Sequence, residues 1–84
     1  MKPIRLSSHA TLYFASRGFT EGEVVYAIRT GTWGPAVRGR LECRVDFPFG
    51  DDWNGKHYLT KQLRPVFVDE PTEIVVVTVY TYYF

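Results

Sequence analysis

From residue 40 onward, apolar and polar positions alternate in the pattern of β-strands. In residues 40–47 the odd positions are apolar and the even ones charged, which is typical of a strand with one buried face. Further strands are expected at residues 57–63 and 65–68. Residues 73–80 are almost continuously β-branched, which predicts a central strand buried on both faces. Residues 48–55 are expected to form a loop that ends in the tight-turn pair Asn54-Gly55.

The first third of the chain carries helix signals. Thr20 and Glu23 have the spacing of a capping box, and Gly31 marks the end of the helix that follows. An earlier helix is expected over residues 9–17, with Ser8 as its N-cap and Gly18 as its terminator.

Two helices followed by a meander of strands predict an α+β fold. We expect two N-terminal helices packed on one face of a mainly antiparallel four-stranded sheet, with residues 3–6 as a short N-terminal edge strand. With 84 residues, the chain is expected to form one domain, residues 1–84.

The composition excludes several classes of protein. Hydrophobic residues make up 45% and charged residues 23%, which excludes a disordered chain. No apolar run reaches the ~20 residues needed to span a bilayer, so no membrane partner is expected. The N-terminal residues form no apolar signal core, and a single cysteine cannot form an internal disulfide. A cytoplasmic protein is therefore predicted.

The net charge is only +1, but it is unevenly distributed. Residues 1–44 carry seven Lys or Arg against three Glu, and residues 45–84 carry three against six Asp or Glu. Seven of the ten cations are arginine, whose planar guanidinium binds phosphate through two hydrogen bonds. A basic face for nucleic acid is permitted, but it must be local.

No strong catalytic motif is present, and Asp51-Asp52 lacks the ligand spacing of a calcium loop, so neither a metal nor a cofactor is expected. His9 is the most informative single residue. His9, Tyr13 and Arg17 are four apart and line one side of the expected helix. The helix dipole favours a neutral His9 that can accept a proton. The alternative is a structural histidine that packs on the sheet and donates one hydrogen bond.

Several other side chains have two interpretations. Arg40 and Arg44 either contact phosphate or pair across strands with acidic neighbours on an exposed face. Lys61 and Arg64 flank the start of the third strand, where either could turn toward that face. Cys43 is expected in the core. Tyr80 is expected to end the central strand, and residues 82–84 cover a sheet edge, stack bases or form a dimer contact.

These landmarks occur in an order that resembles a known family. They are Ser8-His9-Ala10, Arg17-Gly18-Phe19, the capped helix through Val24, Ala27 and Ile28, Arg64-Pro65-Val66-Phe67-Val68, and the strand from Ile74 to Tyr80. The pattern is similar to the domain-of-unknown-function 4258 family of small bacterial and phage proteins, and the resemblance covers nearly the whole chain.

That family looks like a relative of the RelE-type and BrnT-type toxin ribonucleases. The resemblance implies metal-independent RNA cleavage, with RNA or the ribosome and an antitoxin protein as partners. It implies that His9 is the base or acid, that Arg17 and Arg64 hold the phosphate, and that Tyr80 orients the substrate or acts as the acid.

The sequence also supports a second hypothesis. Relative to the family, residues 48–56 form a long insertion, and the net charge is near neutral. Both features favour a non-catalytic interaction module that keeps the fold and binds a protein or RNA partner, or a second copy of the chain. A buried His9, a structure with His9 and Arg64 on opposite sides of the sheet, or a buried ion pair of Arg17 with Glu21 or Glu42 would support this alternative.

Overall fold

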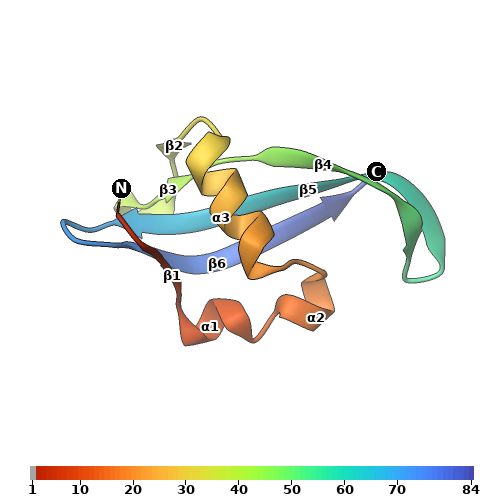
Figure 1. Cartoon of the computed structure of the whole chain (residues 1–84), viewed down its shortest axis with the longest axis horizontal. Coiled ribbons are helices and arrows are strands. Elements are labelled where there is room, and N and C mark those ends of the chain that lie inside the picture. The colour runs from red at the N-terminus through yellow and green to blue at the C-terminus, as the bar shows by residue number, and fades with distance from the viewer. Residues whose placement is uncertain (1) are drawn as a thin grey trace.

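The computed structural model describes residues 2–84, which form one six-stranded sheet and three short helices (Figure 1). The helices are α1 (Ser8–Thr11), α2 (Phe14–Arg17) and α3 (Glu21–Thr30), and a 3-10 turn, η1, spans Val37–Gly39. The strands are β1 (Ile4–Leu6), β2 (Gly34–Pro35), β3 (Leu41–Glu42), β4 (Val45–Trp53), β5 (Lys56–Asp69) and β6 (Ile74–Tyr83). The strand order is β1-β6-β5-β3-β2, and β4 pairs with β5. The predicted α+β class is confirmed, but the predicted two helices and four strands are wrong.

Helix α3 begins where the sequence predicts. The Thr20 side chain accepts from the Glu23 backbone N–H at 3.2 Å, and the Glu23 carboxylate accepts from the Thr20 N–H at 3.0 Å. This reciprocal pair satisfies two backbone donors that a helix leaves free at its start. The capping box is therefore confirmed, and it directs Val24, Ala27 and Ile28 into the core.

The single helix expected over residues 9–17 is wrong. The chain leaves the helical conformation at Tyr13 (φ −102°, ψ 8°), which divides the segment into α1 and α2. The N-cap is Ser7 rather than Ser8, because the Ser7 hydroxyl accepts from the Ala10 backbone N–H at 3.1 Å. Gly18 ends α2 with φ 72°, as expected of a left-handed terminator.

The strand expected over residues 40–47 is interrupted. Leu41 pairs with Phe67 and Val45 with Leu63 in one unbroken register, but Cys43 lies opposite Pro65. Proline has no N–H to donate to the opposite strand, so the backbone pairing is interrupted at Cys43, and β3 and β4 are separate strands. The alternation still holds, and Cys43 is buried as predicted.

The strands beyond residue 47 are longer than expected. Residues 48–53, expected as a loop, continue β4, and a hairpin turn at Asn54-Gly55 leads into β5. Strand β5 runs unbroken where two strands, residues 57–63 and 65–68, were predicted. The hairpin has a packing function. Phe49, Trp53 and Tyr58 surround the ring of Tyr83, and the Trp53 ring is stacked on it at 4.9 Å.

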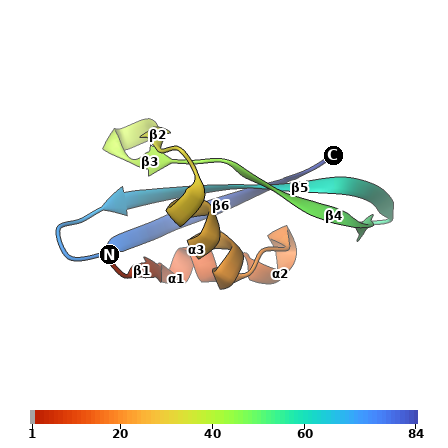
Figure 2. The same cartoon turned by 45° about the horizontal axis from the view of Figure 1, so that its top comes forward.

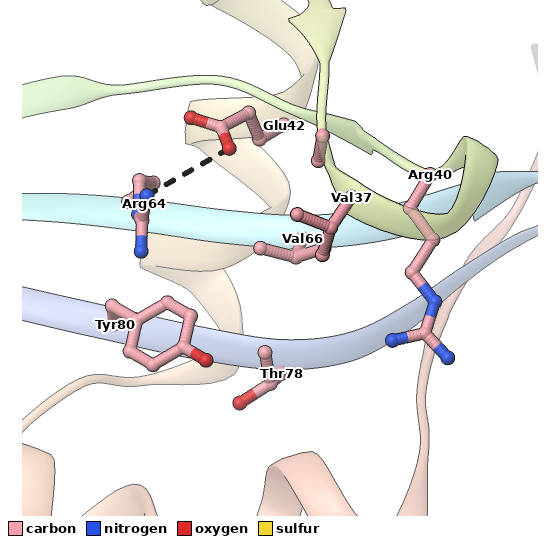
Figure 3. A pocket seen from close by; sticks show the side chains of 8 residues that line it. Val37, Arg40, Glu42, Arg64, Val66, Thr78 and Tyr80 are labelled. Carbon is pink, nitrogen blue, oxygen red and sulfur yellow. Dashed lines mark ion pairs between the residues drawn. The ribbon is translucent and has the colours of Figure 1, made fainter.

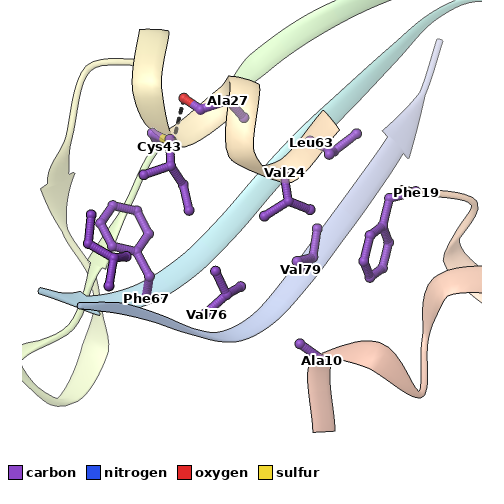
Figure 4. Close-up of a cluster of buried hydrophobic side chains, with 11 residues drawn as sticks. Ala10, Phe19, Val24, Ala27, Cys43, Leu63, Phe67, Val76 and Val79 are labelled. Carbon is purple, nitrogen blue, oxygen red and sulfur yellow. Dashed lines mark hydrogen bonds between the residues drawn. The ribbon is translucent and has the colours of Figure 1, made fainter. Parts of the chain in front are cut away.

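The sheet is buried on one face only. Figure 4 shows the core between α3, β5 and β6, which includes Val24, Leu63, Phe67, Val76 and Val79. The helices lie on this side of the sheet, which we call the packed face (Figure 2). The prediction that β6 is buried on both faces is wrong, since its alternate residues remain half-buried or exposed on the other side, which we call the open face.

Candidate functional site

The open face is occupied by side chains from alternate positions of β5 and β6. Leu63 and Phe67 point into the core, so Arg64 between them points to the open face. Arg64 lies opposite Tyr80 in the β5–β6 register. This pairing places two residues that the sequence proposes as catalytic directly beside each other.

A line of cations and aromatic rings leads from this face, past the end of β1, to α1 and α2 on the packed side. Arg64 Cζ lies 4.6 Å from the centroid of the Tyr80 ring. Arg17 Cζ lies 5.2 Å from the Tyr80 centroid and 3.8 Å from that of Tyr13. The Tyr13 ring meets His9 edge to face at 5.2 Å. We call these five residues the cation–aromatic row.

Arg17 is held in the row by the backbone. Strand β1 pairs with β6 only as far as Val76, and beyond it the guanidinium of Arg17 donates to the Val79 carbonyl at 2.9 Å and to Thr78 Oγ1 at 3.2 Å. The Arg17 carbonyl in turn accepts from Thr81 Oγ1 at 2.6 Å and from Tyr83 Oη at 3.0 Å. Arg17 is therefore fixed in place, and it does not form the ion pair with Glu21 or Glu42 that the alternative hypothesis anticipated.

A pocket of about 160 Å³ opens beside the row, between the β2–β3 connection and the sheet (Figure 3). Arg40 approaches it from the connection, and Arg64, Thr78 and Tyr80 line it from β5 and β6. Since liquid water occupies about 30 Å³ per molecule, the pocket has room for a phosphate group. Both guanidinium groups can donate to such a group.

The charge around the pocket is mainly positive. Glu42 is the one carboxylate that lines it among the described residues, and its oxygens lie 3.7 Å from Arg64 Nη1 and 3.9 Å from Arg44 Nε. These distances are too long for hydrogen bonds. Arg64 Nε is buried and has no hydrogen-bond partner within residues 2–84. An unpaired buried donor costs stability.

Four predicted site residues are not among those that line the pocket: His9, Arg17, Arg44 and Lys61. Arg17 still contacts the Tyr80 ring, and Arg44 lies 3.9 Å from the pocket residue Glu42.

Lys61 is on the packed face, 8% exposed, where its ammonium donates to the Gly18 carbonyl at 3.0 Å and lies 2.7 Å from Glu23. Lys61 therefore does not line the pocket, although the sequence proposes it as a substrate-binding residue. His9 is exposed at the far end of the row and is not among the residues that line the pocket. Its ring packs on Tyr13 rather than on the sheet.

Sequence reasoning missed two parts of the site. One is the pocket wall formed by Ala36 and Val37, which carries no chemical motif. The other is Thr78, which both lines the pocket and accepts from Arg17. A signal for Thr78 was present, because it alternates with Tyr80 about Val79, which is buried.

The fold and the site define a class: a small α+β protein with an arginine–tyrosine row and an anion-sized pocket on an open sheet face. No protein-family model, no curated protein and no solved structure matches the chain. In the described part of the chain, no three His, Cys, Asp or Glu residues form a cluster suited to a metal ion. None of the helices in residues 2–84 has the length and apolar character required to cross a bilayer.

Proposed function

We propose that this protein binds RNA on the open face and cleaves it without a metal ion, as its resemblance to the domain-of-unknown-function 4258 family implies. The observation that carries the proposal is that Arg40, Arg64 and Tyr80 all line one pocket of about 160 Å³. The fixed guanidinium of Arg17, 5.2 Å from the centroid of the Tyr80 ring, supports it.

In this proposal the scissile phosphate occupies the pocket. Arg64 and Arg40 donate hydrogen bonds to its non-bridging oxygens and stabilise the additional negative charge of the pentavalent transition state. The ribose 2′-oxygen attacks phosphorus and loses its proton to a base, while the bond to the departing 5′-oxygen breaks. The products are a 2′,3′-cyclic phosphate and a 5′-hydroxyl group.

Tyr80 and His9 take the two proton transfers. Tyr80, which lines the pocket, is assigned as the acid that protonates the departing 5′-oxygen. His9 is assigned as the base, a role that requires its imidazole to come within about 3 Å of the 2′-hydroxyl. Because His9 lies at the end of the row and outside the pocket, the His9→Ala variant is the most stringent test of these assignments.

The test is incubation of the purified protein with mixed unpaired RNA in excess EDTA. We expect cleavage by the parent with 2′,3′-cyclic phosphate ends, and a loss of about 100-fold or more in Arg64→Ala and Tyr80→Phe. Arg29→Ala is the matched control, because it removes one guanidinium from α3 on the packed side. Equal cleavage by the parent and Arg64→Ala would reject the site, and equal cleavage by His9→Ala would remove His9 from the mechanism.

A second candidate is a non-catalytic RNA-binding module with the same face. The position of His9 favours it, because His9 lies outside the pocket on α1, at the packed side of the sheet, whereas Arg64 is on the open face. It is distinguished by binding without cleavage, with binding reduced in Arg64→Ala. Ribosomes added to the same reaction separate this result from a nuclease that acts only on ribosome-bound RNA.

The toxin assignment belongs to the same proposal. Induced expression of the parent is expected to arrest bacterial growth, and Arg64→Ala is expected to relieve the arrest. Growth arrest by both proteins would show that the toxicity does not depend on the pocket.

A further inference from the structure

The pocket has two features that a phosphate group does not use. Its volume of about 160 Å³ corresponds to about five water molecules, which is more than a phosphate group fills. One wall is aliphatic, formed by Ala36, Val37 and Val66, and Val37 is 74% exposed (Figure 3). The second feature is the carboxylate of Glu42, which repels a phosphate. Both features suit a nucleobase, which has apolar ring faces and polar edges.

The carboxylate of Glu42 has acceptor capacity that its ion-pair partners do not use. Its oxygens lie 3.7 Å from Arg64 Nη1 and 3.9 Å from Arg44 Nε, and both distances are too long for a hydrogen bond. A carboxylate accepts through two oxygens that lie side by side. A ligand with two adjacent N–H donors would therefore satisfy both oxygens at once.

Guanine is the RNA base that offers such a pair of donors. Its Watson–Crick edge carries N1–H and N2–H next to each other. Adenine and cytosine present an amino group beside an acceptor nitrogen, and uracil presents one N–H between two carbonyl groups. Among the four bases, guanine alone can thus donate two parallel hydrogen bonds to one carboxylate.

We propose that Glu42 and the aliphatic wall of the pocket bind a guanine base of the RNA whose phosphate is held by Arg40 and Arg64. The proposal rests on the RNA binding proposed above and adds base specificity to it. Glu42 accepts from N1–H and N2–H of the guanine, and Val37 covers one face of the ring. Any other base leaves the carboxylate without its second donor, which disfavours that base.

The test measures fluorescence anisotropy with labelled 2′-O-methyl RNA, which cannot be cleaved through its 2′-oxygen. Each RNA is a short run of uridines with one central guanosine, adenosine or cytidine, and the all-uridine RNA is the fourth. We expect the RNA with guanosine to bind roughly 5- to 150-fold more tightly than the other three.

Glu42→Gln should abolish this preference, because glutamine has one acceptor oxygen and places its own N–H donors against those of guanine. The readout is the ratio of affinities, since the loss of a negative charge strengthens the binding of all four RNAs alike. Asp46→Asn is the matched control. It removes a carboxylate from the same face that does not line the pocket, and it should retain the preference for guanosine.

The outcomes separate this proposal from the proposed function. If all four RNAs bind equally and their binding depends on Arg64, the face binds RNA and the guanine site is wrong. If none of the RNAs binds, the guanine site and the proposed function are both wrong. A preference for guanosine that persists in Glu42→Gln would reject the role of Glu42. If unlabelled 5′-GMP binds as tightly as the RNA with guanosine, the pocket binds a free guanine nucleotide, and the proposal is also overturned.

Discussion

Lys61 and Arg64 are only three residues apart on β5, yet they have opposite environments. Lys61 is on the packed face, where Glu23 and the Gly18 carbonyl satisfy its ammonium. Arg64 is on the open face between tyrosine rings, with a buried Nε that has no partner in the described chain. The fold supplies hydrogen-bond acceptors for the Lys61 ammonium, whereas it supplies none for the Nε of Arg64 within residues 2–84.

The difference separates stability from binding within a single strand. Polar groups on the packed face connect elements, as Lys61 connects β5 to α3 and to the end of α2. On the open face the corresponding groups surround a pocket whose one carboxylate among the described residues, Glu42, lies 3.7 Å from Arg64, beyond hydrogen-bond distance. We therefore expect substitutions on the packed face to lower stability and leave RNA binding unchanged. Substitutions on the open face should weaken RNA binding with little effect on stability.

The largest effect on stability is expected from Lys61→Met. It leaves Glu23 without its partner in a partly buried position and removes the hydrogen bond to Gly18, which should lower the free energy of unfolding by about 2 kcal/mol. For a domain of this size, that corresponds to a decrease in Tm of roughly 8–16 °C. Thermal unfolding followed by circular dichroism measures it, and RNA affinity at a temperature where the variant is folded should not change.

Arg64→Ala is the matched variant on the other face. Because Arg64 Nε has no partner to lose and its contacts with Glu42 exceed hydrogen-bond length, the free energy of unfolding should change by less than about 1 kcal/mol. The comparison fails if Arg64→Ala destabilises the fold as much as Lys61→Met does, since Arg64 would then be a structural residue.

A smaller effect is expected from pH. Burial, together with the negative charge of Glu42, raises the pKa of Cys43 from 9.0 to about 11. The folded state then holds a proton that the unfolded chain releases, so stability is complete below about pH 9 and falls as the pH rises toward 11. Tyr83 contributes in the same direction, because burial and the charge of Glu23 raise its pKa.

The measurement is Tm between pH 8 and about pH 10.5, in the parent and in Cys43→Ala. The variant should lose Tm less steeply above pH 9 than the parent. An identical pH dependence in the two proteins would show that Cys43 does not contribute. RNA binding is measured at neutral pH, so it is unaffected by this titration.

The structural features that could be predicted from the sequence are those that depend on residues close together in the chain. The Thr20–Glu23 box and the Asn54-Gly55 turn are local, and both are found. Longer-range contacts account for the errors. Pro65 interrupts a strand twenty residues earlier in the chain by lying opposite Cys43, and the aromatic cluster around Tyr83 extends the hairpin that appeared to be a loop.

For the site, the main error has a simple physical cause. Side chains alternate along a strand, so residues three apart point to opposite faces. The predicted break at Arg64, between strands over residues 57–63 and 65–68, concealed this alternation, so Lys61 is predicted on the same face as Arg64. Recognition of one continuous β5 would have separated them. The pocket itself requires the β2–β3 connection to lie over the sheet, which no pattern of residue types reports.

The central claim is that the open face, and Arg64 in particular, binds RNA. The most direct measurement is an NMR titration with an unpaired 2′-O-methyl RNA, which cannot be cleaved through its 2′-oxygen. The titration is followed at the arginine Nε–Hε signals. The account predicts that the signals of Arg64, Arg40 and Arg17 shift with added RNA while that of Arg29 stays in place. Shifts at Arg29 with an unchanged Arg64 signal would place the interaction on the packed side and contradict the account.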